Sequence, residues 1–166
     1  MKIHEYQARS LFAEYGIPTA TGDVVATPQE AVAIARKTGF PVVIKAQVLV
    51  GGRGKAGGVK VVPDEASLIS EFNRIKNLTI KGYRVDRLLV AKAIDIKKEY
   101  YVAVTIDNVR GDVVIIASAD GGVDIEETAR TSPEKILKFY AQGQKTLDES
   151  RWALVAAQLF SDVRLQ

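Results

Sequence analysis

A loop rich in glycine and positive charge is the segment of this sequence best suited to chemistry. Between Lys45 and Lys60, its glycines and cations are Gly51, Gly52, Arg53, Gly54, Lys55, Gly57 and Gly58. Glycine lets backbone N–H groups approach an anion closely, and lysine and arginine add charge and further donors. The loop therefore predicts a nucleotide phosphate site without the Walker pattern. A solvated hairpin loop explains its glycine and lysine content equally well.

Composition indicates a folded protein without disulfides or thiolate metal sites. Of the 166 residues, 47% are hydrophobic and 26% are charged, which is the balance of a chain with a hydrophobic core. The absence of cysteine excludes disulfides and thiolate metal sites, and a single histidine leaves little room for a histidine-ligated metal. A formal net charge of +3 does not indicate a general nucleic-acid surface.

The hydrophobic segments indicate a protein that neither spans nor binds a membrane. The longest apolar runs, such as residues 112–118, have the length of a strand and are too short to cross a bilayer. The first residues lack the apolar core of a signal peptide. We therefore expect a cytoplasmic location.

Helical and strand patterns alternate in the first half of the chain. An amphipathic helix is predicted over residues 3–15, and a short strand over residues 23–26. Thr27, Pro28 and Glu30 form a capping box with proline at the first helical position, and they open a helix that ends at residues 38–39. Strands at 42–45 and 59–62 flank the glycine loop, so Lys45 ends a buried strand. A helix over 64–77 and a strand at 87–90 follow.

The second half predicts a hairpin followed by helices. Strands at 99–106 and 113–116 are joined by the turn residues 107–111. Helices are expected to begin at Ser132-Pro133-Glu134 and to run over residues 147–163. Because a hairpin interrupts the alternation, the fold class is α+β (mixed α/β) and not a doubly wound parallel sheet. We expect a helix in 1–18, one lobe over 19–89 and part of a second over 90–166.

Four separated motifs together resemble a known family. They are His4-Glu-Tyr-Gln-Ala8, Lys45 with residues 51–59, residues 95–96 with 98–100, and residues 121–126. In this order they are similar to the N-terminal part of the β subunits of succinyl-CoA synthetases, which are ATP-grasp proteins. Related subunits of malate-CoA and citrate-CoA ligases share them. The resemblance implies an ATP-grasp fold, incomplete at its C-terminal side, and part of an acid-thiol ligase that couples nucleoside triphosphate hydrolysis to acyl-CoA formation.

The resemblance also implies the residues that bind the nucleotide. They are Lys45, Gly52, Arg53, Gly54, Ala91, Ile94 and Glu99. Lys45 and the loop would hold the phosphates, the segment 90–94 between the lobes would lie beside the base, and Glu99 would lie near the ribose hydroxyls. Without the resemblance, Glu99 is better explained as an exposed glutamate paired with Lys97 or Lys98. The sequence does not distinguish ATP from GTP as the bound nucleotide.

Residues 121–126 are a second candidate site. Gly121 and Gly122 precede two acids, Asp124 and Glu126, at the start of a short helix. Free N–H groups there could meet a phosphate, and the resemblance implies a position near the transferred phosphate. The helix dipole alone also explains acids at a helix N-terminus.

The resemblance assigns the remaining chemistry to other chains or segments. No residue here is assigned a catalytic or metal-binding role, and the Mg²⁺ ligands are expected outside this chain. His4 matches no phosphorylated position, so a partner α subunit would carry the phosphohistidine and the CoA site. We expect a truncated piece or a split-gene subunit that is inactive alone. The alternatives are an unrelated ATP-grasp ligase or a non-catalytic module whose residues 53–60 bind a partner or a nucleic-acid backbone, although no aromatic residues interleave with those cations.

Overall fold

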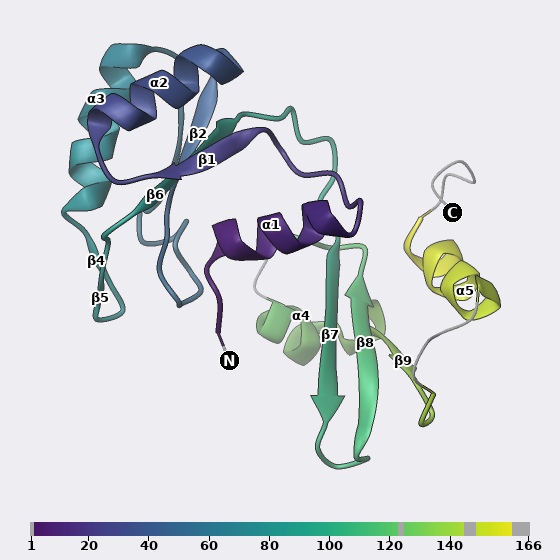
Figure 1. The fold of residues 1–166 in the computed structure, drawn as a ribbon. Helices are drawn as coiled ribbons and strands as arrows, with labels where there is room; N and C mark the ends of the chain where they lie inside the picture. Colours follow the sequence, from purple (N-terminus) through teal and green to yellow (C-terminus); the bar gives the residue numbers. More distant parts are fainter. Residues whose placement is uncertain (1, 123–124, 145–148, 161–166) are drawn as a thin grey trace. The chain divides into compact units, whose positions relative to one another are not determined.

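The chain divides into two compact units, Met1–Asp95 and Ile96–Gln166, each with its own sheet (Figure 1). The computed structural model describes residues 2–122, 125–144 and 149–160. The predicted boundary after residue 89 falls inside strand β6 (Leu88–Lys92), because Val90 and Ala91 pair with strands on both sides. Just after the end of β6, Ala93 donates its N–H to the Pro41 carbonyl. Most of the segment 90–94, which was predicted to lie between the lobes, therefore belongs to the first sheet.

The sheet of the first unit has four antiparallel strands in the order β1-β6-β2-β3. Strands β1 (Gly22–Val25), β2 (Val42–Ala46) and β3 (Val59–Val62) accompany β6. Helices α2 (Pro28–Thr38) and α3 (Glu65–Lys76) cover one face of this sheet (Figure 1). The core between the helices and the sheet is made of fully buried apolar side chains, among them Val42, Ile44, Leu68, Phe72 and Ile75.

Local capping chemistry fixes the helices of this unit where the sequence predicts them. The Thr27 hydroxyl accepts the Glu30 N–H at 3.3 Å, and a Glu30 carboxylate oxygen accepts the Thr27 N–H at 3.2 Å, which confirms the capping box. Asp64 caps α3 in the same way, by accepting the Ser67 N–H at 2.8 Å. Helix α1 (Glu5–Glu14) begins after His4, within the predicted range.

A short hairpin between α3 and β6 was not predicted. Strands β4 (Thr79–Ile80) and β5 (Tyr83–Arg84) pair through a turn in which Lys81 and Gly82 have φ of 49° and 85°. Two positive φ values are typical of a tight hairpin turn, and Gly82 is the signal that could have revealed it. Ile80 is buried, so the hairpin belongs to the core of this unit.

The second unit contains the predicted hairpin and a third strand. Strands β7 (Tyr101–Asp107), β8 (Asp112–Ser118) and β9 (Leu137–Tyr140) form an antiparallel sheet in that order. The Asp107 carboxylate accepts the N–H groups of Val109 and Arg110 at 3.0 and 3.2 Å, which sets the turn between β7 and β8. Helix α4 (Ile125–Thr131) follows the paired glycines as expected.

The prediction that a helix begins at Ser132 is wrong. Pro133–Lys135 form a single 3-10 turn, the Ser132 side chain makes no capping hydrogen bond, and the chain then enters β9. Pairing of β9 with the buried strand β8 outweighs the local signal for a helix start. The predicted last helix is present as α5 (Glu149–Leu159), and residues 147–148 and 161–163 of that prediction lie outside the described residues.

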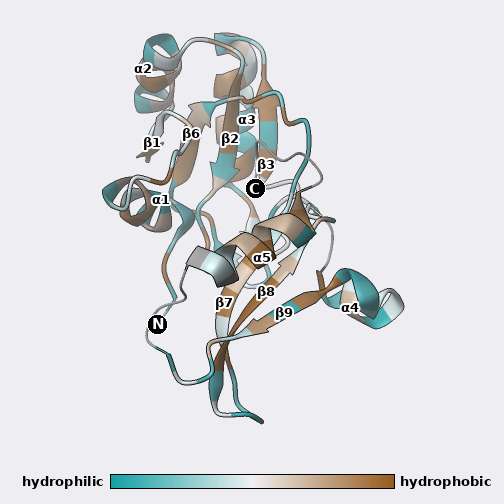
Figure 2. Ribbon diagram, turned by 90° about the vertical axis from the view of Figure 1, so that its right-hand side faces the viewer, coloured by the Kyte–Doolittle hydropathy of each residue, from teal (hydrophilic) through white to brown (hydrophobic). Residues whose placement is uncertain are grey.

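Within the described part of the second unit, edge strand β7 carries an exposed apolar stripe. Helix α5 lies beside β8 (Figure 2), and Val155 and Leu159 of this helix form a buried cluster with Ala117 of β8. On β7 itself, Val102, Val104 and Ile106 are 56%, 66% and 64% exposed. Their alternation places them on one face of the strand. An exposed apolar edge strand favours pairing with another copy of the chain.

We expect this stripe to drive self-association. Replacing Val104 by lysine should keep the chain monomeric at concentrations at which the unaltered chain associates, because a charge interrupts the stripe. Light scattering across a concentration series measures this. The matched control is Thr105→Lys, on the opposite face of the same strand, which should associate like the unaltered chain. Equal suppression by both variants would show that strand pairing at the edge, and not the stripe, causes the association.

Candidate nucleotide phosphate site

Strand alternation places Lys45 on the sheet face that α2 and α3 leave free. Along β2 the buried residues Val42, Ile44 and Ala46 point into the core, so Lys45 points to the opposite side. In β6, Leu89 lies opposite Lys45. Directly paired residues of two strands project to the same side, so Lys45 shares its face with Leu89.

A carboxylate from α1 brings Lys45 and Arg53 together. Glu5 Oε1 lies 3.1 Å from Lys45 Nζ, and Glu5 Oε2 lies 2.8 Å from Arg53 Nη1. The same Arg53 Nη1 donates to the Ala46 carbonyl at 2.9 Å. The side chains of Glu5, Lys45 and Arg53 are only 22%, 31% and 24% exposed. Two of the predicted phosphate residues therefore converge, and a third residue, Glu5, was not predicted as part of the site.

Burial and charge act in opposite directions on the Glu5 carboxyl. Burial raises the pKa of Glu5 because it disfavours the charged form. The positive charges of Lys45 and Arg53, and hydrogen bonds from both, lower it by more, so the net pKa of Glu5 lies below its ordinary value. Glu5 is therefore ionised at neutral pH and offsets part of the positive charge of the site.

The glycines of the loop fall into two groups. Gly58 is buried, and a Cβ added there would lie 2.8 Å from Ile80 Cδ1 and 3.2 Å from Ala46 Cβ. Gly52 and Gly54 are exposed, and an added Cβ on Gly54 would have no neighbour within 4 Å. Gly52 has a φ of 80°, which other residues rarely adopt. Packing thus explains Gly58, backbone conformation explains Gly52, and neither explains Gly54.

Two of the other residues predicted to bind nucleotide lie in or just after β6, and a third belongs to the second unit. Ala91 is buried in β6, two positions beyond Leu89, and Ile94 is 63% exposed after the end of that strand. Glu99 belongs to the second unit, where its carbonyl accepts the Gly121 N–H at 3.1 Å and its carboxylate lies against Gly122. Two motifs singled out in the sequence, Glu99 and the paired glycines, therefore contact each other. Asp124 lies outside the described residues.

No metal site can be assigned to this chain from its described residues. Among residues 2–122, 125–144 and 149–160, no three histidine, cysteine, aspartate or glutamate residues are grouped to hold an ion. The ring of His4 stacks on Tyr6 with centroids 5.7 Å apart. The described residues therefore form no group of three such side chains that could hold a metal ion by itself.

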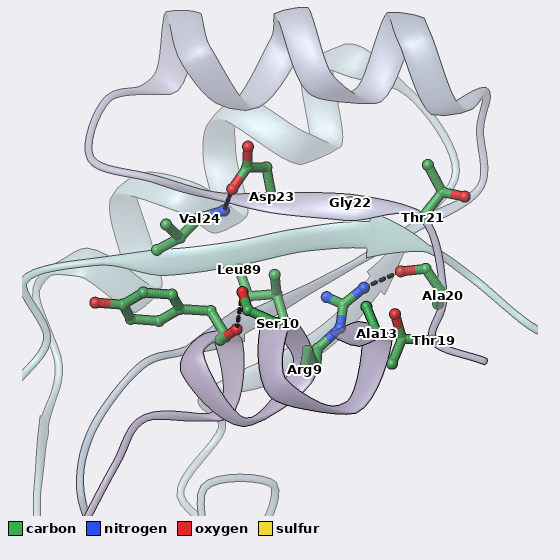
Figure 3. A pocket seen from close by; sticks show the side chains of 11 residues that line it. Arg9, Ser10, Ala13, Thr19, Ala20, Thr21, Gly22, Asp23, Val24 and Leu89 are labelled. Carbon is green, nitrogen blue, oxygen red and sulfur yellow. Dashed lines mark hydrogen bonds between the residues drawn. The ribbon is translucent and has the colours of Figure 1, made fainter. Parts of the chain in front are cut away.

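A polar cavity borders α1 on the free face of the sheet (Figure 3). It has a volume of about 390 Å³ and lies between Arg9, Ser10 and Ala13 of α1 and residues 19–24 with Leu89 of the sheet. The Arg9 guanidinium donates to the Ala20 carbonyl across it. None of the residues predicted to bind phosphate lines this cavity. The cavity therefore shows only where α1 lies against β1 and Leu89.

The first unit thus combines an antiparallel sheet, two helices on one of its faces and a glycine loop that carries Arg53. Residues 2–164 match the family model of the ATP-grasp domain. The chain belongs to the ATP-grasp family, which confirms the predicted fold class and the resemblance found in the sequence. In the part of the chain that the structure describes, no helix has the length and hydrophobicity required to cross a membrane.

Curated relatives narrow the comparison to one group of enzymes. The chain is 51% identical over 141 residues to the ADP-forming succinate–CoA ligase subunit beta of Chloroflexus aggregans, covering 85% of this chain and 37% of that protein. It is 48% identical over 145 residues to the GDP-forming succinate–CoA ligase subunit beta of Thermus thermophilus, covering 87% of this chain and 38% of the relative. The chain thus spans less than two fifths of the length of these relatives.

A solved structure supports the fold. The dinucleotide-forming acetyl-coenzyme A synthetase 1 of Ca. Korarchaeum cryptofilum, solved with coenzyme A and Ca-AMPCP, superposes with a TM-score of 0.76. The match covers 94% of this chain and 66% of that chain at 22% identity. At this identity the likeness concerns the fold alone.

The ion pairs of Glu5 predict a specific loss of stability in acid. A carboxyl whose pKa is lowered on folding stabilises the fold above its unfolded pKa, and that contribution disappears as pH falls through its folded pKa. Glu5→Gln should therefore lower the free energy of unfolding by about 1 to 3 kcal/mol at pH 7, a difference that stays constant above the unfolded pKa of Glu5 and shrinks as the pH falls below it. Denaturant unfolding across pH measures this. Glu14→Gln, at the exposed end of α1, is the control, and a pH-independent difference for Glu5→Gln would contradict the prediction.

Proposed function

We propose that this chain is the nucleotide-binding part of an acid-thiol ligase of the succinate–CoA ligase type, which releases a nucleoside diphosphate. The observation that carries the proposal is the convergence of Lys45 and Arg53, from a strand end and a glycine loop, at a single carboxylate. The curated relatives support the choice of ligase, because they are named as succinate–CoA ligase subunits.

Lys45 and Arg53 suit the binding of a polyphosphate. Transfer of a phosphoryl group spreads negative charge over its oxygen atoms, and fixed cations and N–H donors stabilise that charge. Lys45 supplies a compact ammonium, Arg53 a planar guanidinium, and Gly52 and Gly54 allow the backbone to approach the phosphates. In this proposal the chain binds and orients the nucleotide, and its own side chains form no covalent intermediate.

The same proposed nucleotide site includes the residues that would lie beside the base and the ribose. Ala91 and Ile94 would lie beside the base and Glu99 near the ribose, as the resemblance implies. The nucleotide is ATP or GTP, since relatives of the ADP-forming and of the GDP-forming type are about equally similar to this chain. Mg²⁺, which bridges nucleotide phosphates in such reactions, would be held by residues outside those described. The cytoplasmic location stays a prediction from the sequence.

A partner chain completes the proposed reaction. The relatives are named as subunit beta, which supports a second type of subunit. We propose that this α subunit carries the phosphorylated histidine and the CoA site, and that succinate is the acid. No nucleic acid or membrane takes part.

Replacing Lys45 by methionine tests the phosphate site. It should weaken ATP or GTP binding by about 1.5 to 3 kcal/mol, the range for a hydrogen bond to a charged group, while the fold persists. Calorimetric titration with each nucleotide measures the affinity, and circular dichroism checks the fold. Lys37→Met removes an exposed charge from α2 and should bind as the unaltered chain does. Unchanged affinity in folded Lys45→Met would refute the assignment.

A pair of glycine variants separates ligand contact from packing. Gly54→Ala meets no neighbour, so the free energy of unfolding should change by less than about 0.5 kcal/mol while ATP affinity falls severalfold. Gly58→Ala should instead lower the free energy of unfolding by about 1 to 3 kcal/mol, because its methyl group meets Ile80 and Ala46. Denaturant unfolding and ATP titration distinguish the two. Full ATP affinity in Gly54→Ala would show that the nucleotide does not approach this glycine.

A further inference from the structure

The first turn of α1 is joined to the end of β2 by more than packing. Besides the two ion pairs of Glu5, the Tyr6 N–H donates to Gln47 Oε1 at 3.1 Å. Gln47 is 4% exposed, and its Nε2 donates to the carbonyls of Lys45 and Ala46 at 3.2 and 3.3 Å. The motif that begins at His4 therefore fixes a carboxylate beside the two cations, although the proposed function uses none of its residues.

Glu5 and a phosphate can use different donors of the same cations. In the described part of the chain, Arg53 contacts Glu5 Oε2 and the Ala46 carbonyl through Nη1 alone, so the N–H groups of Nη2 and Nε are available to a ligand there. Lys45 gives one of its three N–H groups to Glu5 and keeps two. A nucleotide phosphate therefore does not need to displace Glu5 in order to contact both cations.

Charge compensation explains why the arrangement persists before a nucleotide binds. Lys45 and Arg53 repel each other, and a carboxylate between them offsets the repulsion. The three groups together still carry a net charge of +1, so they attract an anion. Without Glu5, two long side chains would sample many rotamers and would lose that freedom on binding.

We propose that Glu5 is a positioning residue of the phosphate site, which holds Lys45 and Arg53 in the arrangement that receives a nucleoside triphosphate. Glu5 acts through these two side chains and does not touch the nucleotide. The inference rests on the proposed function of the chain, and it gives a physical role to the motif at residues 4–8. The opposite role, a carboxylate that occupies the phosphate position until the nucleotide displaces it, predicts tighter binding when Glu5 is removed.

Titration of the full chain with ATP tests the inference. Glu5→Ala should bind ATP about fivefold to tenfold more weakly, and Glu5→Gln, which preserves the volume of the side chain, should also bind more weakly. Glu5→Asp keeps the charge and should recover part of the affinity. Glu14→Ala, at the other end of the same helix, is the control and should bind like the unaltered chain.

A second measurement follows Arg53 directly. Side-chain NMR of the arginine Nε–H should give a sharp Arg53 signal in the unaltered chain and in Glu14→Ala, and a broadened one in Glu5→Ala. A merely structural role of α1 would leave this signal unchanged in Glu5→Gln. Equal or tighter ATP binding by folded Glu5→Ala and Glu5→Gln, in a chain whose Lys45→Met variant binds weakly, would overturn this inference alone. Failure of the unaltered chain to bind ATP or GTP would overturn the proposed function and this inference together.

Discussion

Two positive side chains remain close together in a partly buried space only when a negative charge offsets their repulsion. In this chain Glu5 supplies that charge from the first turn of α1, Lys45 comes from the end of β2, and Arg53 comes from the loop beyond it. The candidate site thus depends on α1 lying on the sheet face that α2 and α3 leave free. Strand alternation directs Lys45 to that face, since its neighbours Ile44 and Ala46 fill the core.

The loop combines a closed base with an open tip. At the base, Gly58 donates its N–H to the Arg53 carbonyl at 2.8 Å, and its own carbonyl accepts the Ala46 N–H at 2.7 Å. Glycine is favoured there, because a Cβ would lie 2.8 Å from Ile80 Cδ1 and 3.2 Å from Ala46 Cβ and would force these side chains to shift. At the tip, Gly54 has no neighbour that requires a glycine. The hydrogen bonds at the base of the loop fix the position of Arg53 relative to β2 and β3. The open tip keeps backbone groups accessible to a ligand.

Much of the fold could be predicted because its signals are local. The capping box at Thr27 and Glu30, the proline that follows Thr27, and the turn at Asp107 each depend on residues a few positions apart. The helix expected from Ser132 was wrong for the complementary reason. Its start signal is local, whereas β9 forms because Phe139 and its neighbours pair with residues of β8 that lie 20 to 26 positions earlier in the chain.

The candidate site divides in the same way between sequence and tertiary structure. The sequence by itself determined that Lys45 lies near the end of a buried strand and that Arg53 lies among glycines, because strand period and loop composition are properties of short segments. Only the tertiary structure decided that these cations meet at Glu5, which lies 40 positions before Lys45. An ion pair depends on distance in space, and neither periodicity nor composition specifies which distant carboxylate the folded chain will bring within 3.1 Å.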